Sequence, residues 1–129
     1  MIFNKHFLDT LSEQAKTSPR LRINYDLRNS EQDQSQRMLN ALHPGTQLPI
    51  HRHPDTSETI IVIRGSVCEK YFNDEGEIID IFTLKAGSEE VMLHIPAGTW
   101  HTLECLEAGT IIFEAKDGAY HPVNKEDIK

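Results

Sequence analysis

Short apolar stretches alternate with turn-forming residues over most of the chain. Eight stretches have the length and spacing of β-strands, at residues 37–43, 48–52, 57–64, 66–72, 78–84, 90–95, 100–106 and 110–116. Gly, Pro, Asn and Asp separate them, and the clearest hairpin tip lies at residues 73–76. Several short strands at close, even spacing predict a mainly β sandwich or barrel.

The first 36 residues follow a different pattern. Apolar side chains recur at helical spacing at Phe7, Leu8, Leu11 and Ala15. Asn4 is placed to cap the start of this helix, and Pro19 ends it. A helix this short is marginal alone in water, so we expect it to dock on the β core. Arg20 and Arg22 follow on an extended segment, where they are either solvated or clamp an anionic substrate.

A length of 129 residues fits one domain. Within that domain we expect residues 1–36 to form a helix and extended arm that pack on the barrel. Residues 37–117 would form the β core, and residues 118–129 would be a polar tail that trails over the surface.

Composition narrows the classes of partner. The formal net charge is −7, which argues against nucleic acid or an anionic membrane as the main partner. No apolar stretch approaches the ~18 residues of a membrane-spanning helix, and the N-terminus lacks a signal-peptide hydrophobic region. We therefore expect a cytoplasmic protein in which Cys68 and Cys105 are reduced.

The candidate chemistry begins in residues 45–65. His51 and His53 are two positions apart, so in an extended segment their side chains share a face. Glu58 begins the next strand and is able to face back toward the two imidazoles. His101 follows the Pro96-Ala97-Gly98 turn and is the best candidate for a fourth ligand. Taken alone, the histidine pair suits a solvated strand edge as well as a metal site.

These two stretches match a known pattern at the level of individual positions. Gly45, His51, His53, Glu58 and Gly65 stand at the spacing of the first cupin motif, and the Pro-x-Gly-x-x-His of residues 96–101 fits the core of the second. The chain thus resembles the cupin superfamily, which implies a jelly-roll barrel and a metal held by the three histidines and the glutamate. The glycine usually found five residues before the proline is displaced to position 87, and the position four after the last histidine, usually Asn, holds a cysteine.

A narrower resemblance covers nearly the whole chain. Residues 18–22, 37–42, 94–103 and 113–118 are similar to the WbuC family of cupin-fold metalloproteins. Some of its bacterial members are encoded among surface-polysaccharide genes, so the resemblance implies a sugar-related ligand. The members differ in having proline at the position of Ala119, and some carry an aromatic and proline-containing tail after the position of Val123.

The ligand set implies one divalent transition metal ion with at least one open coordination position. Fe, Mn, Ni, Zn, Co and Cu are all compatible with nitrogen and oxygen ligands, so the sequence does not select among them.

Further candidate residues for catalysis or substrate binding lie on the predicted strands. Glu114 and Lys116 share a face of the last strand and are either cavity-facing acid and base groups or an exposed strand face. Arg37 and Asn40 are substrate-binding candidates at odd spacing, so at most one should see the cavity. Cys105 shares a face with the predicted ligand of the same strand, as either a cavity residue or a small apolar core residue.

Three functions follow as hypotheses. The first is a metal-dependent enzyme (an isomerase, dioxygenase or lyase) that acts on a small polar molecule, with Glu114 moving protons. The second is a non-catalytic metal- or ligand-binding protein, because folds of this kind also host binding functions. The third, disfavoured by the intact ligand set, is a metal-free sugar-nucleotide isomerase or epimerase. Pairing of sheet edges makes a homodimer the expected assembly.

Overall fold

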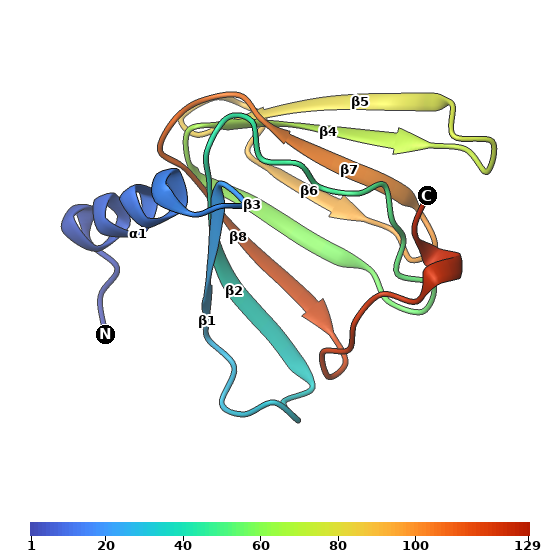
Figure 1. The fold of residues 1–129 in the computed structure, drawn as a ribbon, viewed down its shortest axis with the longest axis horizontal. Coiled ribbons are helices and arrows are strands. Elements are labelled where there is room, and N and C mark those ends of the chain that lie inside the picture. Colours follow the sequence, from blue (N-terminus) through green and yellow to red (C-terminus); the bar gives the residue numbers. More distant parts are fainter.

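The computed structural model describes residues 1–129 and consists of two antiparallel sheets and one α-helix (Figure 1). The larger sheet has the strand order β1-β2-β8-β3-β6 and the smaller one β5-β4-β7. The elements are α1 (Lys5–Thr17), β1 (Arg22–Asp26), β2 (Ser35–Leu42), β3 (Glu58–Arg64), β4 (Ser66–Phe72), β5 (Ile78–Lys85), β6 (Met92–Ile95), β7 (Trp100–Cys105), β8 (Thr110–Asp117) and the 3-10 helix η1 (Lys125–Asp127).

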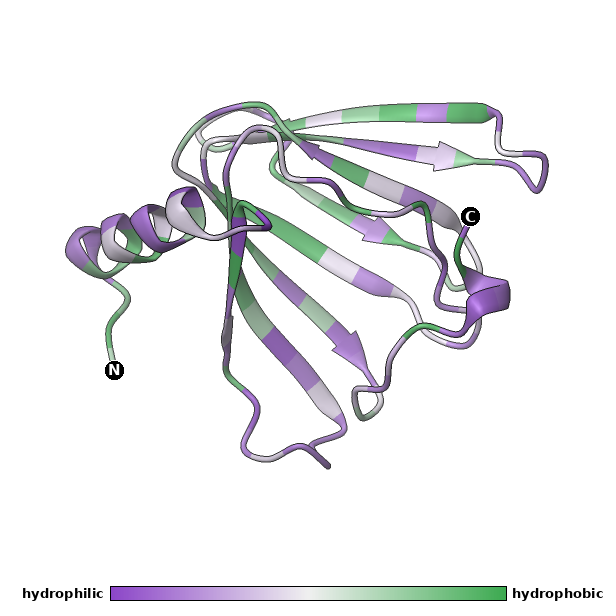
Figure 2. Ribbon diagram, viewed as in Figure 1, coloured by the Kyte–Doolittle hydropathy of each residue, from purple (hydrophilic) through white to green (hydrophobic).

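The two sheets face each other as a β-sandwich. In Figure 1 they lie close together at the left of the view and diverge toward the right. Figure 2 shows polar and apolar residues alternating along β2, β3 and β8, as expected for strands with one face toward the interior. The predicted jelly-roll sandwich with a short N-terminal helix is confirmed.

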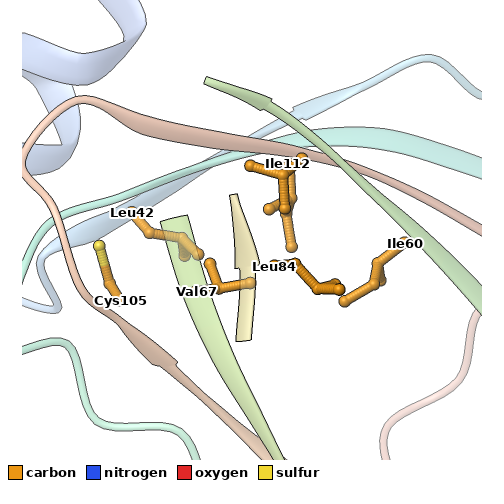
Figure 3. Close-up of a cluster of buried hydrophobic side chains, with 7 residues drawn as sticks. Leu42, Ile60, Val67, Leu84, Cys105 and Ile112 are labelled. Atoms are coloured by element: carbon orange, nitrogen blue, oxygen red, sulfur yellow. The ribbon is translucent and has the colours of Figure 1, made fainter. Parts of the chain in front are cut away.

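An apolar cluster fills the space between the sheets at their closed end. Its members come from both sheets and are all at most 9% exposed (Figure 3); they are Leu42, Ile60, Val62, Val67, Leu84, Cys105 and Ile112. A close-packed interior of this kind stabilises the fold without help from a bound ion.

The helix α1 covers the outer face of the larger sheet. Asn4 caps it as predicted, because its side chain accepts a hydrogen bond of 3.0 Å from the Phe7 backbone N–H. A second apolar cluster joins the helix to β2 and β8, and consists of Leu8, Leu11, Ala15, Leu39, Ala41 and Ile111. No helix of this chain combines the length and the apolar character that crossing a membrane requires.

One sequence-based expectation was wrong. Residues 48–52 form no strand, because only His51 makes isolated bridges there, to His101 and to Ile128. The second of these bridges joins the C-terminal tail to the body of the protein. Asp127 is buried and its carboxylate pairs with Arg52 at 2.7 Å, so the last residues pack against the segment that carries the predicted ligands.

Candidate metal centre

Three imidazoles meet at the open end of the sandwich. One potential ligand atom from each of His51, His53 and His101 lies within 4.8 Å of the others. Two backbone hydrogen bonds, of 3.0 and 2.9 Å, join His51 and His101 directly and fix the distance between their chains. The sequence-based expectation that the two separate segments converge is met in this geometry.

The turn before β7 also positions the second histidine. Gly98 has φ +81°, a left-handed conformation that glycine adopts without strain, and its N–H donates to the His53 carbonyl at 2.8 Å. The Pro96–Gly98 turn therefore holds the 51–53 segment in addition to introducing His101. This contact joins the two stretches directly.

Hydrogen bonds orient two of the three rings. The Nδ1 atoms of His51 and His101 lie 3.0 and 2.9 Å from the carbonyl oxygens of Pro49 and Thr99. A carbonyl only accepts, so these Nδ1 atoms carry the proton and leave the Nε2 lone pairs free. The Nε2 atom of His101 is buried and has no hydrogen-bond partner. A buried polar atom without a partner is costly, and a metal ion would satisfy this one.

The protonation of the three rings favours metal binding. Burial lowers the pKa of His51 and of His53 to about 4, and it also lowers the pKa of His101. Near neutral pH all three are therefore uncharged, which is the form that coordinates a metal. The residues present are able to hold one metal ion.

Glu58 lies beside this group rather than within it. It is buried at the start of β3, and its Oε2 atom is 3.3 Å from Nε2 of His53. The Glu58 carboxyl also raises the pKa of Glu114, after the larger effect of burial. The predicted fourth ligand is thus adjacent to the imidazoles.

Two further carboxyl groups form the interior of the site. Glu114 is partly exposed to the cavity, but its carboxyl is enclosed by protein, and burial raises its pKa to about 8. Asn40 donates to its Oε2 atom at 2.8 Å. Glu69 is 1% exposed, its Oε1 atom has no partner, and burial raises its pKa to about 9. After burial, the charges of Glu58 and Glu114 further raise the pKa of Glu69, and that of Glu58 further raises the pKa of Glu114.

Sequence reasoning missed Glu69. A signal was available, because Glu69 shares a strand face with Val67, which is fully buried on β4. A glutamate that alternates in register with an apolar core position points inward. On an inward face a carboxyl group without full hydrogen bonding lowers the stability of the fold, which makes Glu69 a candidate member of the site.

The groups surround a cavity of about 600 Å³ that opens between the sheets. Among the sequence-predicted residues, Asn40, Glu114 and Lys116 line it, and the Lys116 ammonium is 3.4 Å from Nδ1 of His53. Its volume lies in the range that accommodates small organic ligands.

Two predicted substrate-binding residues lie elsewhere. Arg37 is on the opposite face of β2 from Asn40 and pairs with Asp33 at 3.1 Å. Cys105 does share the inward face of β7 with His101, but it lies four residues toward the closed end, inside the apolar cluster. Its thiol donates to the Glu107 carbonyl at 3.1 Å, so neither residue reaches the cavity.

Residues 3–84 match a protein family described as domain of unknown function (DUF6016). The match covers more than half of the chain. The chain belongs to this family. Among curated proteins, a germin-like protein of Morus alba is 37% identical to this DUF6016 protein over 60 residues. Those residues are 46% of this chain and 27% of the germin-like protein, so the chain spans about a quarter of that relative's length.

Solved structures resemble this DUF6016 protein in fold. The capsular polysaccharide assembling protein CapF from Staphylococcus aureus matches with a TM-score of 0.68 and 21% identity, over 88% of this chain and 32% of CapF. A recombinant oxalate oxidase in complex with glycolate matches with a TM-score of 0.63 and 15% identity, over 84% of this chain and 57% of that one. At these identities the likeness shows the fold alone, which is the cupin fold.

Proposed function

We propose that this DUF6016 protein is a metal-dependent enzyme that acts on a small polar molecule. The observation that carries the proposal is the group of three imidazoles, one of which has a buried Nε2 atom with no partner in the protein. A cavity of about 600 Å³ beside them leaves room for a ligand. An open side at the metal distinguishes a catalytic or ligand-binding site from a purely structural one.

In this proposal His51, His53 and His101 hold one divalent transition metal ion, and Glu58 completes the set. The 3.3 Å contact between Glu58 and His53 supports that assignment. The ion would polarise a carbonyl or hydroxyl oxygen of the ligand. The hydrogen bonds from Nδ1 of His51 and His101 to backbone carbonyls keep their Nε2 atoms directed at the site.

Glu114 is the proposed proton-transfer group. Its pKa of about 8 places its titration close to neutral pH, where an acid or base is most effective. Asn40 holds the carboxyl through Nδ2, at 2.8 Å, and thereby sets its orientation. Lys116 is paired with Glu58 across β8 and β3, and its ammonium lies 3.4 Å from Nδ1 of His53. There the ammonium would bind oxygen atoms of a ligand.

For the ligand we propose a sugar-derived intermediate of surface-polysaccharide synthesis. The support is the resemblance to the WbuC family and the likeness in fold to CapF, a capsular polysaccharide assembling protein. The alternative is a protein of the same fold that binds metal and ligand without converting the ligand.

Elemental analysis of the purified protein tests the metal. We expect about one transition-metal ion per chain, and a loss of at least about tenfold in occupancy for His53→Ala and for His101→Ala. His94→Ala is the matched control, because this histidine is exposed on β6 and bonds only Thr59. Occupancy that is unchanged in the first two variants, or equally reduced in the third, would contradict the ligand assignment. A metal-free wild type would favour the sugar-nucleotide isomerase hypothesis.

Turnover separates the enzyme from the binding protein. We expect conversion of at least one member of a panel of sugar nucleotides and keto acids, loss of that activity after chelation, and recovery when metal is added back. Glu114→Gln should keep its metal and lose turnover, because an amide cannot transfer the proton. Metal-loaded protein that binds panel members and converts none would support the alternative.

A further inference from the structure

Three cationic side chains on the cavity wall have no acidic partner. Seven of the thirteen Lys and Arg residues are paired with a carboxylate, namely Lys5, Arg28, Arg37, Arg52, Arg64, Lys70 and Lys85. Arg20, Arg22 and Lys116 line the cavity and make no such pair. In a chain with 20 acidic and 13 basic residues, unpaired cations gathered in one cavity are unexpected.

Arg22 is held in place by neutral groups. Its Nη1 atom donates to Thr46 Oγ1 at 3.2 Å and to the Gln47 carbonyl at 2.9 Å. Thr46 is 7% exposed, and its hydroxyl donates to the Arg20 carbonyl at 2.7 Å, so one buried threonine fixes both arginine segments. The guanidinium is thus oriented while its Nε and Nη2 donors make no hydrogen bond with the protein.

The backbone between the two arginines is strained. Leu21 has φ +57° and is the sole residue other than glycine with a positive φ. A leucine in this conformation is strained, and such strain is concentrated at functional sites. The strain accompanies the placement of both Arg20 and Arg22 on the wall of one cavity.

We propose that this cavity binds a small organic anion whose carboxylate or phosphate group pairs with Arg22, assisted by Arg20. The proposal rests on the metal-dependent function above, since the other end of the same ligand would face the histidines. A planar guanidinium with two free donors matches two oxygens of one oxyanion.

The dimensions of the site fit such a ligand. Gln47, which holds Arg22, is four residues from His51, and four residues of extended chain span at most ~14 Å. Arg22 lies on the edge strand β1, level with Leu42, whereas Glu58 lies three strands away and level with Gln36, six residues along β2. At the usual spacings these offsets are ~14 Å across the strands and ~20 Å along them. The anionic group would therefore lie away from Glu58, at one end of a ligand whose length is limited by the span from Gln47 to His51.

A titration of isotope-labelled protein tests the anion site directly. The side-chain Nε–H resonances of Arg22 and Arg28 are followed while sodium phosphate or sodium acetate is added, with sodium chloride at matched ionic strength. Arg28 is the internal control, because it lines the same cavity but its Nε and Nη2 atoms already bind Asp26 at 2.7 to 3.0 Å. We expect a saturable shift for Arg22 alone, and the anion with the higher affinity identifies the group.

Substitution completes the test. Arg22→Gln should weaken binding of the better anion by about tenfold, because it removes a charge-assisted hydrogen bond, while Arg28→Gln should leave binding nearly unchanged. Linear shifts indistinguishable from chloride, or equal losses in both variants, would overturn the proposal. The titration is run on protein as purified and on chelated protein. A protein that is purified without metal and still binds the anion would contradict the function proposed above but not the anion site.

Discussion

The inward faces of the strands are apolar at one end of the sandwich and polar at the other. On β7 the inward residues run from Cys105 through Leu103 to His101, and on β3 they run from Val62 through Ile60 to Glu58. The same strand therefore contributes to the core at one end and to the candidate site at the other. Stability and chemistry are separated by position along each strand rather than by domain.

The two ends of the sandwich contribute to the free energy of unfolding with opposite signs. Apolar burial at the closed end stabilises the fold by about 25 cal/mol per Å² removed from water. At the open end, buried imidazoles and carboxyls such as Glu69 lose hydration without full compensation, which lowers the free energy of unfolding. The closed end thus offsets the cost of the polar end, and each end can be perturbed without destroying the other.

The largest effect is expected at the closed end. Leu84 is 4% exposed within the apolar cluster, so Leu84→Ala should lower the free energy of unfolding by about 2 to 5 kcal/mol. Ile81→Ala is the matched control, because Ile81 lies on the same strand but is 55% exposed. Chemical denaturation measures both, and any folded Leu84→Ala protein should still bind metal. Similar losses in the two variants would show that the interior of the cluster is not the source of stability.

A smaller effect, dependent on pH, is expected at the open end. The pKa of Glu69 in the folded protein is raised to about 9 from 4.5, so the folded state holds a proton that the unfolded state has released. Stability contributed in this way is complete below about pH 4.5 and is lost as the pH rises toward 9. Between about pH 7 and pH 9 wild type should lose roughly 2 kcal/mol more than Glu69→Gln, which has no proton to release.

Denaturation of chelated protein at several pH values measures this difference. Glu75→Gln, in the exposed turn between β4 and β5, is the control and should follow the wild-type curve. Parallel curves for wild type and Glu69→Gln would mean that this carboxyl is ionised in the folded state. The polar end would then be less costly than its burial indicates.

The sequence predicted the helix and most of the strands better than the contacts between them. Alternation and turn residues were enough to predict most strands, and the helix followed from its cap at Asn4 and its apolar spacing. The convergence of His51, His53 and His101 was expected from motif spacing, which the structure now explains through the bond from Gly98 to His53. Residues 48–52 were misjudged because they are extended yet lack a neighbouring strand to pair with.

Long-range contacts account for the remaining differences. The position of Arg22 depends on Thr46, which lies 24 residues away, and no local pattern encodes that contact. Glu69 was missed because a single acidic residue in an apolar strand is usually exposed. Its inward direction is evident only when it is compared with the apolar residues on the same face of the strand. The return of the last residues to Arg52 also depends on a pairing across 75 positions.

The smallest effect is expected where the C-terminal segment packs against Arg52 at the open end. Arg52 donates to Asp127 at 2.7 Å and lies 4.5 Å above the Trp100 ring, while Asp127 is nearly buried. Arg52→Gln should therefore cost about 1 kcal/mol, compared with less than about 0.5 kcal/mol for the Lys70→Gln control, whose partner Glu104 is exposed. Amide exchange should accelerate at Ile128 and Lys129, whose N–H groups bond Lys125 and Ile50, but not at the closed end. Unchanged exchange at these two amides would show that the segment is fixed by its backbone bonds alone.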